Sequence, residues 1–317
     1  MRNYIIRRIL IAIPTFLGIT VLTYLISSLA PGGPIEILMS NPYITAEEIE
    51  RKKVELGLNQ PVLIQYVKWL LQLLQGNMGY SIRTSQPVVQ LLAERIGPTL
   101  LLTGSSILLS IVVALPMGIM AAVKPYSGWD YISSGVSFLA VATPNFFAGL
   151  VLVYLFSLKL PIFPVSGMYT IGKAHTLGDL AIHLVLPCVV LAFQQVGSLV
   201  RYVRSSMLEV LEEDYIRTAR AKGLKEKLVI CRHGLHNALV PVVTIIGMQI
   251  PFMVGGAVVT EQIFGWPGIG TLMVQSINAR DYPVIMGITV WIAVMVLIGN
   301  LIVDLIYGVL DPRISYK

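Results

Sequence analysis

The residues that come closest to a nucleotide-binding pattern lie at positions 167–173, in the string Gly-Met-Tyr-Thr-Ile-Gly-Lys. This string fits the first seven positions of a phosphate-binding loop, in which an eighth residue, Ser or Thr, holds Mg²⁺ through its hydroxyl. The eighth residue here is Ala174, and no clear strand–loop–helix pattern surrounds the string. The sequence therefore predicts no ATP-hydrolysing site in this chain.

The other residues that could do chemistry do not form a catalytic or metal-binding set. The four histidines are scattered, and the two cysteines, Cys188 and Cys231, fall in an apolar run and in a charged loop. This placement fits neither a disulfide framework nor the spacing of metal ligands. A membrane-embedded enzyme would need paired groups such as His with Glu at a defined spacing, and these are absent. We expect no catalytic residue, no metal and no cofactor in this chain.

A short charged stretch, residues 212–223, stands out in a chain that is otherwise mostly apolar. Asp214 is suited to be the N-cap of a helix, and Gly223 suits the left-handed position that ends one. Cations between them lie toward the negative end of the helix dipole. About two turns fit between these residues, too few to be stable alone in water, so flanking segments or a docked protein must hold them. An ordinary cytoplasmic loop is the alternative interpretation.

The composition of the whole chain is that of a membrane protein. Of 317 residues, 55% are hydrophobic and 13% are charged, whereas about 25% charge is usual in soluble domains. Six apolar runs approach or exceed the ~20 residues that a helix needs to cross a bilayer. They cover residues 9–30, 98–123, 131–158, 180–200, 238–263 and 284–310. We predict an all-α integral membrane protein with six transmembrane helices and a short charged helix between helices 4 and 5.

The first run competes with a second interpretation, a cleavable signal peptide. A signal peptide has an apolar core of only about 7–15 residues, whereas residues 9–30 are long enough to span the bilayer. We therefore expect an uncleaved first transmembrane helix.

Lys and Arg are unequally distributed over the flanks of these runs. If the N-terminus is cytoplasmic, that side carries fourteen of these cations, whereas the opposite short loops carry three, Lys159, Lys173 and Arg280. Cytoplasmic loops normally carry the excess of positive charge. We therefore expect both termini and residues 201–236 on the cytoplasmic side.

The runs divide the chain into three parts. Residues 1–30 hold the N-terminus and first crossing, residues 31–97 form a long polar segment, and residues 98–317 hold five crossings and the charged loop 201–236. The polar segment balances six cations against six acids, so we expect an extracytoplasmic elaboration that lies against the membrane. Within it, Thr45 and Glu48 predict a capping-box helix start, and residues 62–74 predict an amphipathic helix.

The run from Asp214 to Gly223, Asp-Tyr-Ile-Arg-Thr-Ala-Arg-Ala-Lys-Gly, is followed at residues 233–241 by His-Gly-Leu-His-Asn-Ala-Leu-Val-Pro. Together they resemble the ATPase-coupling loop of ABC importer permeases, in particular the dipeptide/oligopeptide branch of the peptide and nickel permease family. The broader pattern begins Glu-Ala-Ala, where this chain has residues 217–219, and carries a Gly where it has Gly223. The Leu-Pro that ends the pattern reads Leu-His at residues 235–236. Both departures match the peptide branch, and the resemblance covers nearly the whole chain.

This resemblance implies a permease subunit in a bacterial-type inner membrane that forms half of a path for dipeptides or oligopeptides. It also implies a second homologous permease, two cytoplasmic ATPase subunits that bind ATP and Mg²⁺, an extracytoplasmic solute-binding protein, and no nucleic acid. The implied coupling residues are Asp214, Tyr215, Ile216, Arg217, Thr218, Ala219, Arg220, Ala221, Lys222 and Gly223. Import of nickel or glutathione is an alternative. An ion-coupled secondary transporter would need inverted repeats and an ionisable mid-membrane cluster, which the sequence does not offer.

Polar residues inside the apolar runs are candidates for the path. They are Asn145, Gln194, Gln195, Gln249 and Asp304. Interhelical hydrogen bonding is the usual use of such amides, and an intramembrane carboxylate is a functional candidate that can equally anchor its helix. Both uses stay open. As a set, the amides suit a cavity for a zwitterionic, neutral substrate better than one for a strong net charge.

A second stretch with the same resemblance runs over residues 261–270, Glu-Gln-Ile-Phe-Gly-Trp-Pro-Gly-Ile-Gly. Three glycines and a proline do not continue a membrane helix, so we expect a turn at the outer surface with Trp266 at interfacial height. The resemblance implies an outward loop that approaches the binding protein. Its residues would be Glu261, Phe264, Gly265, Trp266, Pro267 and Gly268. A plain re-entrant turn is the alternative.

Overall fold

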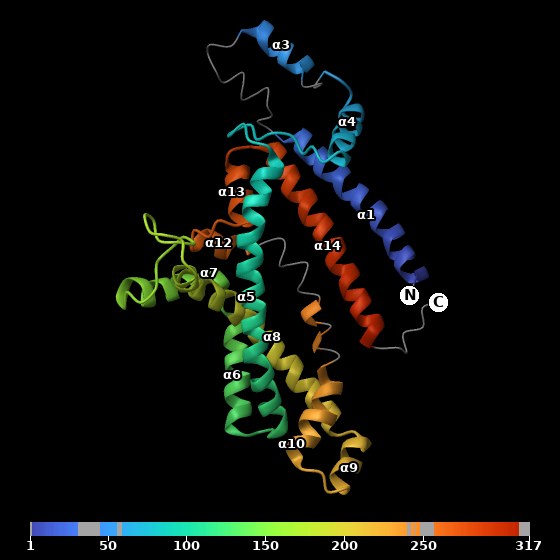
Figure 1. Ribbon diagram of the computed structural model, residues 1–317, viewed down its shortest axis with the longest axis vertical. Helices are drawn as coiled ribbons and strands as arrows, with labels where there is room; N and C mark the ends of the chain where they lie inside the picture. Colours follow the sequence, from blue (N-terminus) through green and yellow to red (C-terminus); the bar gives the residue numbers. More distant parts are fainter. Residues whose placement is uncertain are drawn as a thin grey trace.

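The computed structural model describes residues 2–30, 45–55, 59–239, 242–243, 245–247 and 257–310. These residues form helices joined by turns and loops (Figure 1). In chain order the helices are α1 (Arg2–Leu29), α3 (Ala46–Glu55), α4 (Val62–Leu74), α5 (Val88–Val123), α6 (Gly128–Ala142), α7 (Asn145–Leu152), α8 (Leu177–Leu211), α9 (Asp214–Ala221), α10 (Glu226–Leu228), α12 (Val258–Ile263), α13 (Ile269–Asn278) and α14 (Tyr282–Leu310). Two π-helical segments, Val153–Lys159 and Val229–Gly234, extend α7 and α10. The helical fold class is confirmed for this part of the chain.

Four described helices are long and apolar enough to cross a membrane. They are Ile6–Leu29, Val88–Val123, Leu177–Leu211 and Tyr282–Val303, and they match the predicted first, second, fourth and sixth crossings. The helices run past the predicted ends. α5 begins ten residues before the boundary drawn at residue 98, and α8 continues eleven residues into the predicted loop 201–236. Of the 26 residues of the predicted fifth crossing, 238–263, twelve lie outside the described residues.

The predicted third crossing, residues 131–158, is broken. α6 and the helix over Asn145–Lys159 meet at an angle of 103°. Proline disfavours the helical conformation in the residue before it, and Thr143, which precedes Pro144, is extended with φ −88° and ψ 119°. The pair is a bent span or a re-entrant segment, which gives up to five candidate crossings among the described residues.

α8 is the centre of the packed core because α5 and α6 both lie against it. A Cβ at Gly118 would lie 2.6 Å from the Cβ of Val203, so α5 and α8 touch almost backbone to backbone. A Cβ at Gly197 would lie 2.8 Å from both the Cβ of Ala140 and the carbonyl oxygen of Ser137 on α6. Nothing larger than glycine fits at either contact without movement of its neighbours.

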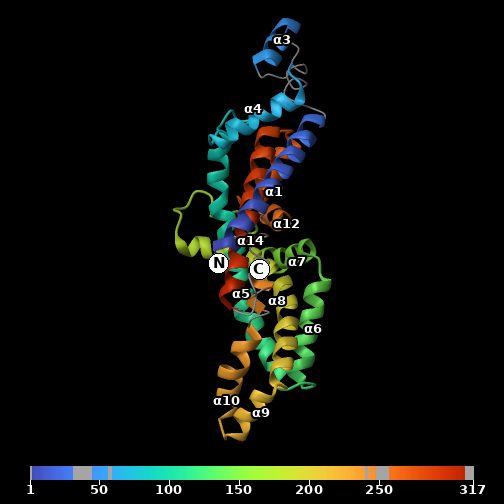
Figure 2. The same ribbon diagram turned by 90° about the vertical axis from the view of Figure 1, so that its right-hand side faces the viewer.

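The molecule is elongated, and its two ends carry different elements (Figures 1 and 2). One end carries α9 and α10, next to the turn between α5 and α6, and we call it the α9 end. The opposite end carries α3, α4 and the start of α5, and we call it the α4 end. There, α5, α13 and α14 share a buried apolar cluster that includes Val88, Ile269 and Ile288.

The elaboration at the α4 end has the local structure that the sequence predicts. The backbone N–H of Glu48 donates to Thr45 Oγ1 at 3.3 Å, and that of Thr45 donates to Glu48 Oε2 at 3.0 Å, which forms the capping box of α3. α4 spans the predicted residues 62–74. It contacts α1 through Tyr66, whose hydroxyl is 3.0 Å from Thr20 Oγ1, and Tyr24 lies edge-on to the Tyr66 ring.

Candidate functional site

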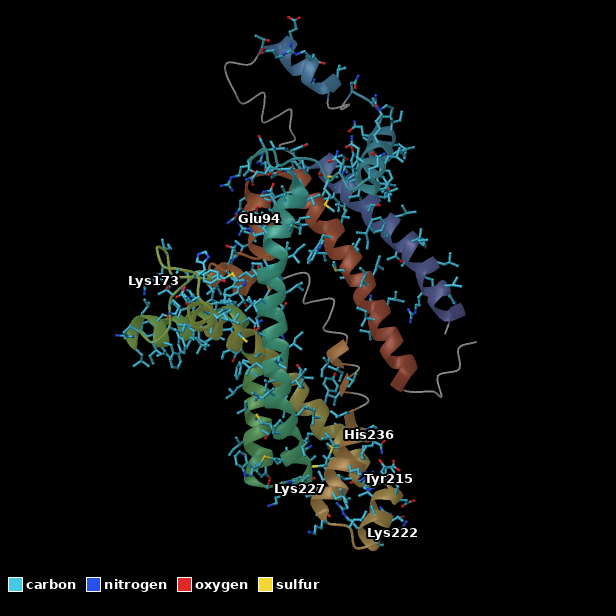
Figure 3. All side chains as sticks on the ribbon, viewed as in Figure 1. Glu94, Lys173, Tyr215, Lys222, Lys227 and His236 are labelled. Atoms are coloured by element: carbon cyan, nitrogen blue, oxygen red, sulfur yellow. The ribbon has the colours of Figure 1, made fainter. Side chains whose placement is uncertain are left out.

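α9 forms the tip of the α9 end, where Figure 3 labels Tyr215 and Lys222 among its side chains. The helix begins after Glu213, which is extended with φ −67° and ψ 147° and occupies the N-cap position without a side-chain cap. The prediction that Asp214 is the N-cap is therefore wrong by one residue. Asp214 lies in the first turn, where a carboxylate favours the helix dipole, and its Oδ1 accepts a hydrogen bond from Arg217 Nη1 at 3.3 Å.

The end of α9 is as predicted. Gly223 has φ +75°, the left-handed conformation that a Cβ penalises. Its N–H donates to the carbonyl of Arg220 at 2.9 Å, and the N–H of Leu224 donates to that of Ala219 at 3.4 Å. These two bonds are the Schellman pattern, which satisfies carbonyls left unpaired at a helix end. The chain therefore leaves α9 in one defined direction.

α9 also has an inner face, which the sequence did not reveal. Ile216 and Ala219 are buried against Val229 and Leu211 of this same chain. Ala219, one of the implied coupling residues, is therefore covered by this chain itself and does not lie on the surface that a partner would meet. The exposed positions of the helix are Asp214, Tyr215, Arg217, Thr218, Arg220 and Ala221.

Two polar contacts tie α9 to the segment that follows it. Asn237 Nδ2 donates to the Tyr215 hydroxyl at 3.0 Å. Arg220 Nη2 donates to Glu226 Oε1 at 2.7 Å, and Arg220 Nε donates to Oε2 at 3.2 Å. The guanidinium lowers the pKa of Glu226 below its usual value, so the pair stays charged at neutral pH. Because both partners are exposed, water screens the attraction, and the pair fixes orientation more than it adds stability.

An ion pair that the sequence did not predict connects α6 and α8. Arg204 Nε lies 2.6 Å from Asp130 Oδ1, and Arg204 Nη2 lies 2.8 Å from Oδ2. Asp130 also accepts from the backbone N–H of Tyr126 at 2.9 Å, and it is almost fully buried. Asp130 stands three residues after Ser127, which caps α6, so local sequence patterns explain its position but not its partner.

The candidate path residues separate into two groups. Asn145 Nδ2, on α7, donates to Gln194 Oε1, on α8, at 2.9 Å, so the structure brings these two amides together beside the bend. Gln195 points to α5 instead, where Ser110 Oγ donates to its Oε1 at 3.2 Å and Ser106 Oγ accepts from its Nε2 at 3.4 Å. Gln195 therefore joins helices within the core. Gln249 and the side chain of Asp304 lie outside the described residues.

Residues 261–270 are folded inward. The Glu261 carboxylate is fully buried and accepts from Thr99 Oγ1 at 2.9 Å and from the backbone N–H of Thr271 at 3.0 Å. A Cβ at Gly268 would lie 2.3 Å from Glu261 Oε1, and one at Gly270 would lie 2.9 Å from Oε2. These glycines let the carboxylate reach the N-terminus of α13, where free N–H groups favour an anion.

Trp266 belongs to the same inward structure. Its ring is fully buried, and its Nε1 donates to the carbonyl of Pro98 on α5 at 2.9 Å. The sequence predicts Trp266 at interfacial height, and the structure shows that its ring is buried within the chain and does not face its surface. Phe264 is also buried, whereas Gly265 is exposed and Pro267 is half-buried. Of the six residues implied for contact with the binding protein, Gly265 and Pro267 are accessible and the other four are buried.

The phosphate-loop-like string 167–173 is a surface loop. No strand precedes it among the described residues, and the backbone N–H of Gly167 donates to the carbonyl of Phe264 at 2.8 Å. Thr170 Oγ1 donates to Asp179 Oδ1 at 2.6 Å, which ties the loop to the first turn of α8. Over the part of the chain that is described, no three His, Cys, Asp or Glu side chains are grouped as metal ligands.

Comparison with known proteins gives consistent matches. Residues 114–316 match the family described as binding-protein-dependent transport system inner membrane component, and residues 1–103 match the family of its N-terminal part. The chain is 48% identical over 317 residues to the oligopeptide transport system permease protein AppB of Bacillus subtilis (strain 168), with 100% of both chains covered. It is 38% identical over 338 residues to the dipeptide transport system permease protein DppB of Escherichia coli (strain K12), again with 100% of both covered.

Two solved structures share the fold at low sequence identity. One is the inward-facing MetNI methionine ABC transporter, with a TM-score of 0.57 and 17% identity over 72% of this chain and 100% of that chain. The other is an amino acid ABC transporter, with a TM-score of 0.53 and 15% identity over 69% of this chain and 94% of that chain.

Proposed function

Because the chain belongs to the family of binding-protein-dependent transport system inner membrane components, we propose that it is the permease subunit of an ATP-driven importer for dipeptides or oligopeptides. Full-length relatives at 48% and 38% identity, named for oligopeptide and dipeptide transport, support this cargo over nickel or glutathione. The chain is not an enzyme. ATP hydrolysis is the work of partner subunits, and this chain supplies part of the path.

The observation that carries the proposal is α9, a short helix with a buried inner face and an exposed outer face at one end of the molecule. We assign coupling to the outer face, which a partner ATPase would contact. The inner face, packed on Leu211 and Val229, would pass displacement to α8 and to the helical residues that follow. Importers alternate between inward- and outward-facing states, so a rigid link of this kind is what transmission needs.

The proposed complex places this chain beside a second homologous permease, two cytoplasmic ATPase subunits and an extracytoplasmic solute-binding protein. In it the chain crosses the inner membrane six times with both termini and the α9 end in the cytoplasm. The asymmetry of fourteen cations against three supports this orientation. Lys222, Lys227 and His236, all labelled at the α9 end in Figure 3, belong to the cation-rich side.

The proposed path passes the paired amides of Asn145 and Gln194. Their mutual hydrogen bond is accessible, because Gln194 is exposed and Asn145 is half-buried in the single chain. Amides offer both donors and acceptors, which suits peptide groups without selecting a side-chain charge.

Substitution of Ala221 by Trp tests the coupling assignment. Ala221 is exposed on α9, so the indole adds bulk to the outer face without entering the core of this chain. Overpacking at an interface costs about 1–3 kcal/mol, which weakens docking about 5- to 150-fold. In proteoliposomes that contain the whole importer, Ala221→Trp should abolish stimulation of ATP hydrolysis by peptide-loaded binding protein, and peptide uptake should fall with it.

The matched control is Ala174→Trp, the same change at an exposed alanine of the loop next to α8. This variant should retain wild-type stimulation and uptake. Full stimulation and uptake in Ala221→Trp would show that the outer face of α9 does not contact the ATPase, and the coupling assignment would then be wrong.

A further inference from the structure

A cavity of about 260 Å³ opens at the α4 end, between the loop over residues 80–87, the first turns of α5 and the helix α13. Its floor is apolar and consists of Leu91, Leu272 and Val284, which are buried in the cluster shared by α5, α13 and α14. Its rim is polar and includes Arg83, Arg95, Glu94 and Gln275. Figure 3 shows Glu94 near the top of α5, beside α13.

The loop that forms one wall is held in place by Asp281, a buried residue just before α14. Its carboxylate accepts hydrogen bonds from the Ser81 hydroxyl, from the backbone N–H of Ile82 at 3.1 Å and from that of Arg83 at 3.5 Å. Ser81 Oγ in turn accepts from the backbone N–H of Thr84 at 3.0 Å. The wall is therefore preformed in this chain.

The charged side chains at this cavity differ in their hydrogen-bond and ion-pair partners. The Asp281 carboxylate is occupied by three donors, and Glu94 accepts from Gln90 Nε2 at 3.2 Å. The ion pairs within the described residues do not include Arg83 or Arg95, although the charge of Arg95 also acts on the buried Glu261 carboxylate. Guanidinium groups bind carboxylates through paired hydrogen bonds.

We propose that this cavity is the docking site of the solute-binding protein, and that a carboxylate side chain of that protein inserts between Arg83 and Arg95. The inference rests on the proposed function, which places the α4 end outside the cell. The family description itself, binding-protein-dependent transport, names the class of partner that must meet this end of the chain.

The surface next to the cavity fits a protein better than a lipid. Tyr80 and Ile277, the neighbours in sequence of lining residues Ser81 and Ser276, are 63% and 52% exposed. Tyr and Arg are enriched in protein interfaces, where apolar contacts are surrounded by a polar rim. The exposed surface of α4 includes Lys68 and Gln72 but is by contrast mostly apolar, with Leu63, Leu71 and Leu74, and suits the bilayer.

The test measures the dissociation constant of peptide-loaded binding protein for the assembled importer in phosphatidylcholine nanodiscs. The double variant Arg83→Ala, Arg95→Ala should raise this constant by about tenfold or more and should flatten its dependence on salt, because close charge pairs across interfaces contribute at least this much. Assembly with the ATPase subunits, followed by size-exclusion chromatography, checks that the variant folds. Lys173→Ala, which removes a cation on the separate loop labelled in Figure 3, is the control and should leave the constant unchanged.

Each result has one interpretation. An unchanged dissociation constant in the assembled double variant overturns the docking site while the transport function stands. A variant defect that appears only when anionic lipid is added would identify a lipid phosphate as the occupant and also overturn the proposal. Recovery of binding when Arg83→Glu is combined with an acid-to-Lys change in the binding protein would support it. If wild-type importer shows no stimulation by binding protein, the proposed function itself fails before any variant is compared.

Discussion

Arg204 holds both carboxylate oxygens of Asp130, at 2.6 Å and 2.8 Å, and thereby fixes the first turn of α6 to the last third of α8. Asp130 is nearly fully buried, and the Arg204 side chain is 29% exposed. The pair lies seven residues before the end of α8, which leads directly into α9. It joins the element that carries the bend at Pro144 to the element that carries the proposed coupling helix.

Arg204→Gln should destabilise the chain. Removal of one partner from a fully buried pair costs about 3–5 kcal/mol, and the partial exposure of Arg204 reduces this to about 1–3 kcal/mol. The measurement is thermal unfolding of the purified importer, in which the variant should melt several degrees below wild type. Arg201→Gln, three residues earlier and exposed, is the control and should change the midpoint little. Equal shifts in the two variants would show that the contact with Asp130 contributes nothing.

Gly268→Ala should destabilise the segment from α12 to α13. The added methyl would overlap the Glu261 carboxylate. Because hydrogen bonds from Thr99 and Thr271 fix this carboxylate, it has little room to move away. Overpacking of this kind costs about 1–3 kcal/mol. Limited proteolysis and thermal unfolding should both report the loss. Gly178→Ala, where nothing lies within 4 Å of the new Cβ, should be neutral or slightly stabilising, and comparable losses in both variants would contradict the proposed contact.

Gly223→Ala should impair coupling through backbone strain alone. Nothing lies within 4 Å of the added Cβ, but φ is +75°, and the left-handed conformation costs an L-residue about 1–2 kcal/mol. The chain after α9 should then depart in a different direction, and stimulation of ATP hydrolysis by binding protein should fall. Gly172 has φ +79° and equally open space on the loop before α8, so Gly172→Ala carries the same strain without the coupling defect. Normal stimulation in Gly223→Ala would show that this direction is unimportant.

The natural cysteines report the orientation of the chain. Cys231 is exposed at the α9 end and Cys188 is buried in α8. A membrane-impermeant maleimide should label Cys231 in cells only after permeabilisation. Gly172→Cys in a Cys231→Ser background should react from outside without it. The reverse pattern would place the α9 end outside and contradict the proposed topology.

Local patterns in the sequence were sufficient for much of the fold. Apolar run length located α1, α8 and α14, because a bilayer requires such lengths. The capping box of α3 and the left-handed Gly223 were equally local, and both are confirmed. The start of α5 and the end of α8 were placed too far inward, because hydropathy marks where a helix becomes polar and not where it stops.

Contacts between distant residues were beyond reach of these patterns. Trp266 was predicted at interfacial height from its place at the end of a span, but the pattern did not indicate that Pro98 on α5 provides a buried acceptor for its N–H. Likewise, the resemblance places Ala219 among the coupling residues, and only the fold shows that it is buried against Val229 of the same chain. Asp130 and Arg204 are 74 residues apart, and nothing local in either helix pairs them.

The contact at Gly197 joins α6 and α8 closely, so a small tilt at this point becomes a larger displacement of α9. α6 packs so closely on α8 there that a Cβ at Gly197 would overlap it, and the ion pair of Asp130 and Arg204 holds the same two helices together seven residues further on. From Gly197 to Leu211 the helix extends about 21 Å at 1.5 Å per residue, and a tilt of about 10° would carry Leu211 about 4 Å sideways. α6 and α8 would therefore tilt together, and a rotation that small at mid-helix would move α9 by nearly the diameter of a methyl group at the coupling surface.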